Sequence, residues 1–347
     1  MTETTLPRAA TANATMKGVG VLAFGGAEAL EMLDWPMPHP APSEVRVRVA
    51  MSGVNYIDVY MRSGQYANSQ TYQTPLPLLL GMEGAGWIDA LGREVEGLRV
   101  GDRVAWCISR GSYAQFAVVP AWKLVPVPDD IDFPLATALQ LQGATAHYLS
   151  HSLFRLRPGS TCLVHAGAGG VGQLLVQLAK LRGARVFATV GTPDKADIVR
   201  SLGADEAILY REVNFREAVR DLTGGAGVDV VYDSVGRDTI QDSIRSLRRR
   251  GTCVMFGAAS GQVECIAPLD LAEAGSVFFT RPNLADYMQP EEVRHRASEL
   301  FELARSGRLK VTIDRTFGHG QVPDAHRMLE GRQTRGKLLI DIARHAG

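Results

Sequence analysis

Residues 161–183 read TCLVHAGAGGVGQLLVQLAKLRG, the clearest structural signal in the chain. Thr161–His165 is typical of a short buried strand, and Gly167–Gly172 is a G-x-G-x-x-G turn. Apolar residues from Val171 to Leu178 then recur with the spacing of one helix face. In such a strand–turn–helix, glycines let a pyrophosphate approach the backbone, and the helix N-terminus attracts its charge. The stretch predicts a dinucleotide-binding unit; a glycine turn without a ligand is the alternative.

Beyond this unit, apolar strands alternate with amphipathic helices, which predicts a doubly wound parallel sheet. The basic run Arg248–Arg250 is interpreted as the end of a helix, where cations are favoured. The predicted strands are Ala184–Val190, Glu206–Tyr210, Val228–Asp233, Thr252–Gly257 and Ser276–Thr280, and the predicted helices are Ala136–Leu149, Asp194–Leu202, Phe215–Leu222 and Asp238–Arg248.

The N-terminal third has a different pattern of short strands and glycine turns, which favours a small, partly open barrel. Glu44–Val49 alternates as a half-buried strand does, and Gly53–Tyr66 is interpreted as a site loop. A late helix, Glu291–Ser306, and a closing strand, Gly336–Ile342, are expected to return to this first domain. The predicted organisation is a disordered tail over residues 1–16, a catalytic domain over 17–135 and 286–347, and a cofactor domain over 136–285.

Composition narrows the class of protein. The 347 residues include 37 basic and 37 acidic side chains, and this balance argues against a general nucleic-acid or membrane surface. No apolar run approaches the roughly 20 residues of a membrane helix, and the N-terminus lacks the apolar core of a secretory signal. The four cysteines are scattered, which speaks against a disulfide framework or a structural zinc site. A cytoplasmic protein with no nucleic-acid or membrane partner is expected.

Several motifs follow one another along nearly the whole chain: Asn55-x-x-Asp58-x-Tyr60-x-Arg62-x-Gly64-x-Tyr66, Gly81-x-Glu83-x-x-Gly86, Gly101–Val104, Leu141–Tyr148, Ala166–Gly172, Val231–Gly236 and Thr280–Pro282. With these motifs in this order, the chain resembles the zinc-independent medium-chain dehydrogenases/reductases, and within them the zeta-crystallin-like NADPH quinone reductases. The resemblance implies a GroES-like catalytic domain, a Rossmann domain for NADPH, and homodimers joined through the last Rossmann strand near Ser276–Thr280.

The chain departs from the zinc-dependent branch of that superfamily at its ligand positions. Asn55 stands where that branch has a catalytic cysteine, and Met82 where it has a histidine. Neither side chain is a serviceable zinc ligand. Glu83 alone makes no metal site and is interpreted as a structural acid. We therefore expect no functional metal.

The resemblance also assigns site residues. It implies a substrate pocket with Asn55, Tyr60 and Tyr66 as catalytic residues, in which a tyrosine hydroxyl holds a carbonyl oxygen or donates a proton. The alternative is that the two tyrosines are ordinary half-buried aromatic residues. The implied cofactor contacts are Asn55, Thr145, Gly169, Gly170, Val171, Gly172, Gly191, Lys195, Tyr210, Ser234, Phe256 and Arg332.

The end of the second predicted strand favours NADPH over NADH. NAD-specific domains usually place an acid there, about 20 residues past the glycine turn. Here Thr189–Thr192 contains no acid, and Lys195 follows closely. Asp194 is the complication: it is either a displaced ribose ligand or an exposed residue of a helix first turn, the second being favoured by the helix dipole.

These observations together predict an NADPH-dependent, metal-free reductase that positions a nicotinamide against a quinone. An α,β-unsaturated carbonyl or an enoyl thioester is the alternative substrate, because the loop Ala67–Leu79 shapes the pocket in a way that the sequence does not specify. A nucleotide-binding structural or RNA-binding protein with vestigial activity is the alternative of another class.

Overall fold

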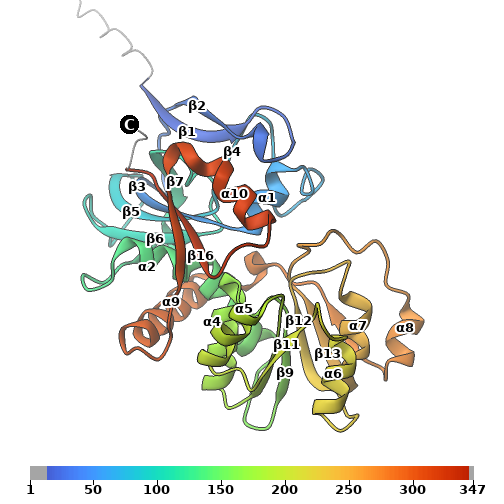
Figure 1. Cartoon of the computed structure of the whole chain (residues 1–347). Coiled ribbons are helices and arrows are strands. Elements are labelled where there is room, and N and C mark those ends of the chain that lie inside the picture. Colours follow the sequence, from blue (N-terminus) through green and yellow to red (C-terminus); the bar gives the residue numbers. More distant parts are fainter. Residues whose placement is uncertain (1–13, 344–347) are drawn as a thin grey trace, which may run out of the picture.

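The computed structural model describes residues 14–343 and has two lobes (Figure 1). The upper lobe contains both the first and the last described segments of the chain. The lower lobe contains the middle of the chain, from β9 to β14. Among the described residues, no helix is both long and apolar enough to cross a bilayer.

The lower lobe is built on a six-stranded, all-parallel sheet with the order β11-β10-β9-β12-β13-β14. Chain order therefore reverses between β9 and β12, the kind of point at which such sheets bind ligands. The strands are β9 (Thr161–Val164), β10 (Arg185–Val190), β11 (Glu206–Leu209), β12 (Val228–Asp233), β13 (Leu247–Met255) and β14 (Phe278–Thr280).

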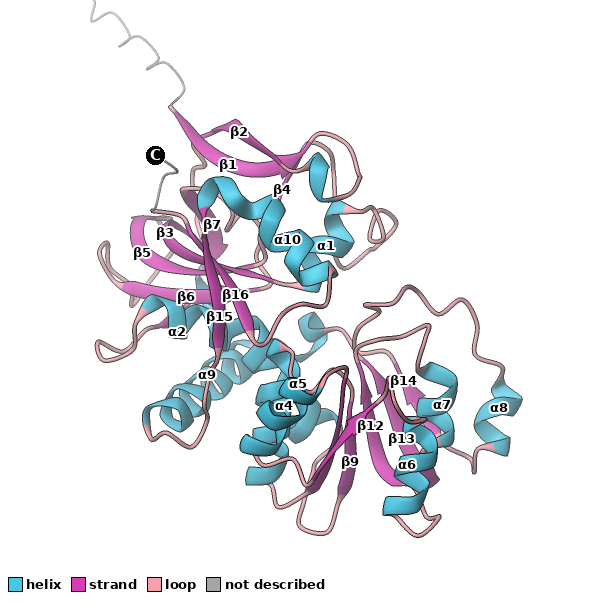
Figure 2. Cartoon of the chain, in the orientation of Figure 1, coloured by secondary structure: helices cyan, strands magenta, loops and turns pink. Residues whose placement is uncertain are grey.

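Helices cover both faces of this sheet (Figure 2). Apolar residues of α4 and α5 share one buried cluster with Tyr232, whereas those of α6 and α7 share another with Val231. Neighbouring side chains of a strand point to opposite faces, so the two helix pairs lie on opposite sides, as a doubly wound sheet requires. The helices are α4 (Gly170–Leu181), α5 (Pro193–Ser201), α6 (Phe215–Leu222), α7 (Ile240–Arg245) and α8 (Pro268–Glu273).

The interpretation of Arg248–Arg250 as a helix end is wrong. Helix α7 ends at Arg245, and the basic run belongs to the start of β13. Leu247 pairs with Val228, which draws the chain into the sheet before the run begins. Arg248 instead forms an ion pair with Asp229 at 2.5 Å.

The upper lobe contains a seven-stranded sheet with the order β15-β16-β3-β5-β6-β8, in which β7 also pairs with β3. Strand β16 runs antiparallel to β3, so residues near the C-terminus complete a sheet begun by the first third of the chain. The strands are β3 (Glu44–Val54), β5 (Glu83–Leu91), β6 (Arg103–Cys107), β7 (Phe116–Pro120), β8 (Val125–Pro126), β15 (Ile313–Gly318) and β16 (Lys337–Asp341).

A small sheet of β2 (Glu31–Pro36), β1 (Thr15–Val21) and β4 (Leu78–Leu79) completes the strands of the upper lobe. The tail expected over residues 1–16 lies mostly outside the described residues. Its last two residues, Thr15 and Met16, belong to β1, because the Met16 side chain is buried and the strand pairs with β2.

The helix predicted over Ala136–Leu149 is longer and less regular than expected. Asp132 caps its start by accepting a hydrogen bond from the Leu135 N–H at 2.9 Å. Two π-helical segments interrupt it, and such wider turns often occur at functional sites. Its segments are α2 (Phe133–Ala138), the π-helical η3 (Leu139–Gly143), α3 (Ala144–His147) and the π-helical η4 (Tyr148–Leu153).

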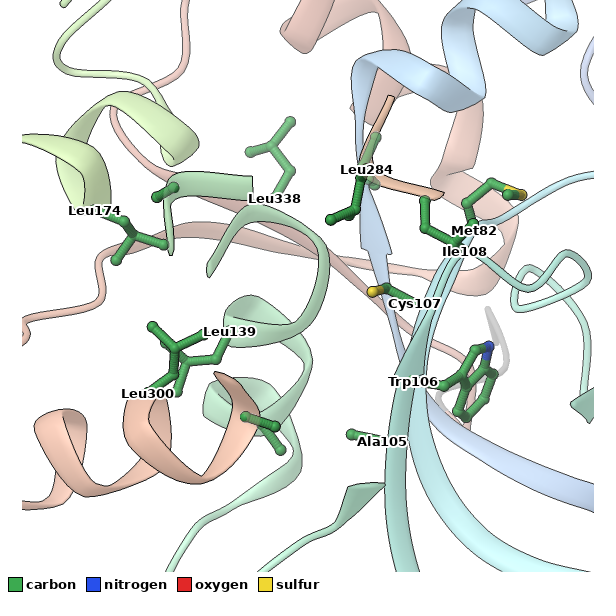
Figure 3. Close-up of a cluster of buried hydrophobic side chains, with 14 of the residues drawn as sticks. Met82, Ala105, Trp106, Cys107, Ile108, Leu139, Leu174, Leu284, Leu300 and Leu338 are labelled. Atoms are coloured by element: carbon green, nitrogen blue, oxygen red, sulfur yellow. The ribbon is translucent and has the colours of Figure 1, made fainter. Parts of the chain in front are cut away.

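This interrupted helix packs against α9 (Pro290–Arg305), the late helix of the chain. Leu139 and Leu300 meet in the buried apolar cluster that continues into the upper lobe (Figure 3). The remaining helices of the upper lobe are α1 (Tyr56–Arg62) and α10 (Val322–Glu330). A continuous core therefore holds the two lobes against each other.

Candidate active site

One large cavity, of about 550 Å³, is lined by residues of both lobes. It lies at the carboxyl ends of the parallel strands, where the strand order reverses. Every site residue predicted from the sequence lines it: Asn55, Tyr60, Tyr66, Thr145, Gly169, Gly170, Val171, Gly172, Gly191, Lys195, Tyr210, Ser234, Phe256 and Arg332.

The glycine turn forms one wall of the cavity and has room for a phosphate. Helix α4 begins at Gly170, and Gly169 is its extended N-cap residue. A Cβ on Gly172 would collide with the carbonyl oxygen of Ala166, so the helix can approach the strand only without a side chain there. A Cβ on Gly169 would have only that same oxygen nearby, at 3.2 Å, which leaves its outer side open to a ligand. The first N–H groups of α4 fit a pyrophosphate.

Basic groups gather beyond the end of β10. The Lys195 ammonium donates a hydrogen bond to the Arg332 carbonyl oxygen at 2.8 Å. Gly191 lies close to Tyr210, since a Cβ added there would be 3.0 Å from the hydroxyl oxygen. Arg211 also lines the cavity; sequence reasoning missed it, although it directly follows the predicted Tyr210. This part of the site suits a phosphate on the cofactor ribose.

Asp194 does not belong to the cavity lining. It lies in the first turn of α5, is exposed, and forms an ion pair with Arg335 at 2.7 Å. Of the two interpretations of this residue, the structure supports the exposed first-turn acid. Of the described residues Thr189–Lys195, which follow the glycine turn at the end of β10, none therefore places an acid in the cavity lining, where NAD-specific domains hold the ribose.

At the opposite end of the cavity, Tyr60 bridges the two lobes. Its hydroxyl oxygen accepts a hydrogen bond from the Ala258 N–H at 2.9 Å. Burial raises the pKa of Tyr60 above its ordinary value, so the hydroxyl remains protonated at neutral pH. Since the oxygen is the acceptor for Ala258, the hydroxyl proton can still be donated to a bound molecule.

Tyr66 stands beside Tyr60 in an aromatic wall. Its ring meets that of Tyr60 edge-on at 5.5 Å and stacks on that of Tyr72 at 5.2 Å, with the planes 19° apart. Within residues 14–343 its hydroxyl has no hydrogen-bond partner and is open to a ligand. Sequence reasoning did not identify Tyr56, Tyr72 and Tyr148 as lining residues. Tyr72 could have been identified, because it lies in the loop that was expected to shape the pocket.

Arg281 is a further lining residue that sequence reasoning did not assign. It is half-buried and donates a hydrogen bond to the Pro282 carbonyl oxygen at 3.0 Å. No carboxylate of the described residues lies within ion-pair distance of its guanidinium. The substrate end of the cavity therefore carries an uncompensated positive charge.

The segment from Gly53 to Tyr66 was predicted to be a loop, but it contains helix α1. Asn55 is the residue before the helix, and its N–H donates to the Asp58 carboxylate at 2.9 Å, one half of a capping box. Thr145, on α3, donates its hydroxyl to the Leu141 carbonyl oxygen at 2.7 Å. The backbone of Asn55 and the side chain of Thr145 are thus held in place at the cavity wall.

Glu83 and Lys337 form a fully buried ion pair next to Asn55. The carboxylate also accepts hydrogen bonds from the Asn55 amide at 2.9 Å and from the Leu141 N–H at 2.5 Å. Glu83 is therefore a structural acid, as predicted, and its oxygens are already committed. Sequence reasoning missed Lys337, because a lysine after a glycine in a short strand carries no local signal of burial.

Met82, the other position compared with the zinc-dependent branch, lies beside Ile108 in the apolar cluster (Figure 3). A thioether among hydrocarbon groups and an amide bound to an ion pair make no zinc site. The residues at these positions do not fit a catalytic metal.

Among residues 14–343, the acidic and histidine side chains close enough to share a metal are His147, His151 and Glu299, which lie outside the cavity lining. There, the Arg296 guanidinium donates to His147 Nδ1 at 3.4 Å, and the other ring nitrogen lies 3.0 Å from Glu299. Burial lowers the pKa of His147 to about 4. A neutral imidazole with both nitrogens hydrogen-bonded explains this group without a metal.

Comparison with known proteins shows family matches in both lobes and relatives that cover most of the chain. Residues 41–129 match the family described as alcohol dehydrogenase GroES-like domain, and residues 170–304 match zinc-binding dehydrogenase. A quinone oxidoreductase of Pseudomonas aeruginosa is 41% identical over 93% of this chain and 99% of its own length. A 2-haloacrylate reductase of Burkholderia sp is 40% identical over 87% of this chain and 91% of its own.

Solved structures agree with these matches. The Escherichia coli quinone oxidoreductase complexed with NADPH superimposes with a TM-score of 0.90 at 37% identity, covering 94% of this chain and 100% of that one. A quinone oxidoreductase of Pseudomonas syringae pv. tomato gives the same TM-score at 39% identity over the same shares. The chain therefore belongs to the zinc-independent quinone oxidoreductase family of the medium-chain dehydrogenases/reductases.

Proposed function

We propose that the protein is an NADPH-dependent reductase of quinones that works without a metal. The observation that carries the proposal is one cavity that joins a dinucleotide cradle at the glycine turn to an end lined by tyrosine rings and hydroxyls. NADPH, when bound, supplies the hydride. The relatives named quinone oxidoreductase, one of them complexed with NADPH, support both the cofactor and the reaction.

The chain's own residues divide the work of binding. The N–H groups of Gly169–Gly172 hold the pyrophosphate, and Lys195, Tyr210 and Arg332 surround the ribose phosphate. The other predicted cofactor residues lie nearer the reacting end of the cavity and position the nicotinamide there: Asn55, Thr145, Ser234 and Phe256.

At the substrate end, the hydroxyl proton of Tyr60 and the open hydroxyl of Tyr66 hold the carbonyl oxygen of the acceptor. Because the pKa of Tyr60 is raised, its hydroxyl keeps the proton at neutral pH, and the residue acts as a hydrogen-bond donor rather than as an acid. A planar quinone packs against the stacked rings of Tyr66 and Tyr72. Negative charge that develops on the acceptor oxygen is stabilised by these donors.

The direct test is NADPH oxidation by the purified protein with a panel of 1,4-quinones, enones and enoyl thioesters. We expect turnover with quinones and much weaker turnover when NADH replaces NADPH. A protein that binds NADPH but reduces no member of the panel would refute the proposal and favour a structural or RNA-binding protein with vestigial activity.

A second candidate substrate class is supported by Arg281. Its uncompensated guanidinium in the cavity favours an anionic acceptor such as an α,β-unsaturated carboxylate, and one relative is named a 2-haloacrylate reductase. Acrylate-type acids and their uncharged amides are therefore compared as acceptors. Arg281→Gln abolishes any preference for the acid if the guanidinium binds the carboxylate.

We also propose that two copies join at the outer edge of β14 and that the dimer works in the cytoplasm. Within the described residues, β14 pairs only with β13, which leaves an open strand edge. Phe278 on this edge is 60% exposed, and Leu269 on the nearby α8 is 67% exposed. Light scattering should give twice the 37.5 kDa chain mass, and Phe278→Asp should give monomers.

A further inference from the structure

Beneath the cavity, four side chains from distant parts of the chain form one buried polar cluster. Glu83 comes from β5, Lys337 from β16, Asn55 from the start of α1 and Gln142 from the π-helical segment η3. Each is at least nine-tenths buried. A Cβ on Gly53 would collide with the Glu83 carboxylate, so the backbone of β3 makes the room that the cluster needs.

The contacts of this cluster give the Asn55 amide one orientation. Its oxygen accepts hydrogen bonds from the Lys337 ammonium at 2.9 Å and from the Gln142 amide at 3.3 Å. Its nitrogen donates to the Glu83 carboxylate at 2.9 Å. A flipped amide would turn N–H groups toward two donors and an oxygen toward a carboxylate. All three contacts would become repulsive, so the orientation is set by the neighbours.

One N–H of the Asn55 amide remains. The amide nitrogen has two hydrogens, and the single partner that it has among residues 14–343 is Glu83. Asn55 is also part of the cavity lining. The second N–H is thus the polar group that this residue can offer to a bound molecule, and it is a donor. Its natural partner is a carbonyl oxygen.

The cluster also reaches the glycine turn. A Cβ on Gly170 would collide with the amide oxygen of Gln142, so that side chain lies directly against the start of α4. Gln142 therefore contacts both the cofactor cradle and the Asn55 oxygen. One residue, Gln142, thus contacts both the Asn55 amide and the glycine turn that is expected to hold the pyrophosphate.

We propose that Lys337 is a positioning residue: through its contacts with Glu83 and Asn55, it holds the Asn55 amide with one N–H directed into the cavity as a donor to a carbonyl oxygen. This inference rests on the proposed reductase function and deepens it. The carbonyl oxygen belongs either to the acceptor or to the carboxamide of the nicotinamide. The two sources share the same chemistry, and the experiment distinguishes them.

The test removes both charges together, because Lys337→Met alone would leave a buried carboxylate without a counter-ion. In the charge-free variant Glu83→Gln/Lys337→Met, the new glutamine can donate as well as accept, so Asn55 can take either orientation. Arg46→Met/Asp89→Asn is the matched control, since it removes a 2.6 Å ion pair of the same sheet that lies outside the cavity. Circular dichroism and thermal unfolding verify that each variant folds.

Four proteins are compared by their kcat/KM for the acceptor: the wild type, Asn55→Ala, the charge-free variant and the combination. Asn55→Ala should lower kcat/KM by about tenfold, as expected for one hydrogen bond lost in the transition state. The charge-free variant should show a similar loss, but less than a twofold further loss when Asn55 is already alanine. Additive losses, or wild-type kinetics in the charge-free variant, would overturn the proposal.

A second variant keeps the test decisive if the charge-free protein does not fold. Gln142→Met removes one of the two donors to the Asn55 oxygen and leaves the ion pair in place. It should lower kcat/KM by about two- to fourfold, and it should have no further effect in the Asn55→Ala background. An equal effect in both backgrounds would contradict positioning through Asn55.

Cofactor binding identifies the source of the carbonyl oxygen and does not depend on turnover. NADP⁺ is compared by calorimetry with its thionicotinamide analogue, in which sulfur, a weaker acceptor, replaces the carboxamide oxygen. If Asn55 donates to the cofactor, the wild type prefers NADP⁺ and the charge-free variant loses that preference. If Asn55 donates to the substrate, only the acceptor kcat/KM falls. Either result supports the proposal.

The same comparison separates this proposal from the proposed function. A wild-type protein that reduces no acceptor refutes the reductase but still binds the two cofactor analogues. A preference for NADP⁺ that disappears in the charge-free variant then supports the positioning role. Equal binding of the two analogues by that inactive wild type, or a preference that survives removal of the charges, overturns it.

Discussion

Lys195 gives the sharpest prediction about cofactor choice. Its ammonium lies at the cavity wall beyond β10 and donates to the Arg332 carbonyl oxygen at 2.8 Å. Burial lowers its pKa from the ordinary value, because the charge is partly removed from water. A phosphate on the ribose would be a stronger partner than a neutral carbonyl oxygen. Lys195→Ala should therefore weaken the binding of NADPH and leave that of NADH nearly unchanged.

The magnitude follows from the contacts. A hydrogen bond to a charged group contributes about 1.5–3 kcal/mol. The lower end applies here, since Lys195 gives up its contact with Arg332 when it turns to the phosphate, and Arg211 supplies remaining positive charge. About 1.4 kcal/mol corresponds to tenfold in affinity. We expect the KM for NADPH to rise about tenfold and that for NADH to change by less than about twofold.

Steady-state kinetics and fluorescence titration with each cofactor measure this effect. Lys180→Ala is the matched control, because Lys180 lies on α4 of the same domain, pairs with Asp205 at 2.7 Å and does not line the cavity. A Lys195→Ala protein that discriminates between the cofactors as the wild type does would refute the reasoning. So would a wild type that uses both cofactors equally.

Three further predictions concern the acceptor, acid stability and metal. Tyr60→Phe should lower kcat/KM about tenfold, because one hydroxyl donor to the acceptor is lost, and the affinity for NADPH should stay within about twofold of the wild type. Unchanged kinetics with every acceptor would show that Tyr60 is a structural residue. Burial lowers the pKa of His326 from its usual 6.5 to about 3, so between these pH values the unfolded chain binds more protons than the folded chain. The free energy of unfolding should therefore fall by about 1.4 kcal/mol per pH unit on acidification below pH 6.5. In urea unfolding, the difference in this free energy between pH 7 and pH 5 should be smaller for His326→Gln than for the wild type, and an equal difference would contradict this prediction. Dialysis against a chelator should leave activity intact, and elemental analysis should find no stoichiometric zinc, because Asn55 and Met82 occupy the ligand positions; zinc lost together with activity would disprove it.

Local sequence patterns predicted the parallel sheet well, for a physical reason. The predicted strand Val228–Asp233 coincides with β12, because its valines and tyrosine, lying between turn residues, have the β-branched and aromatic character of a strand. The glycine turn was recognised because each glycine meets a local steric demand, as the collision between a Cβ on Gly172 and the Ala166 oxygen shows.

The errors arose where a distant partner decides the local structure. Arg248 joins a strand because its neighbour Leu247 pairs with β12, and nothing in the basic run itself specifies that pairing. The helix predicted over Ala136–Leu149 is interrupted by π-helical turns, and within one of them the Leu141 N–H donates to Glu83, 58 residues earlier in the chain. Tertiary contacts override such local preferences.

The sequence by itself determined the dinucleotide-binding turn and the missing acid after the second strand, because both depend on residues that are neighbours along the chain. Only the tertiary structure decided what surrounds Asn55. Lys337 contacts it across 282 positions of sequence, because β16 pairs with β3. The burial of Lys337 beside the active-site cavity is therefore a consequence of the tertiary fold, and no local pattern of residues predicts it.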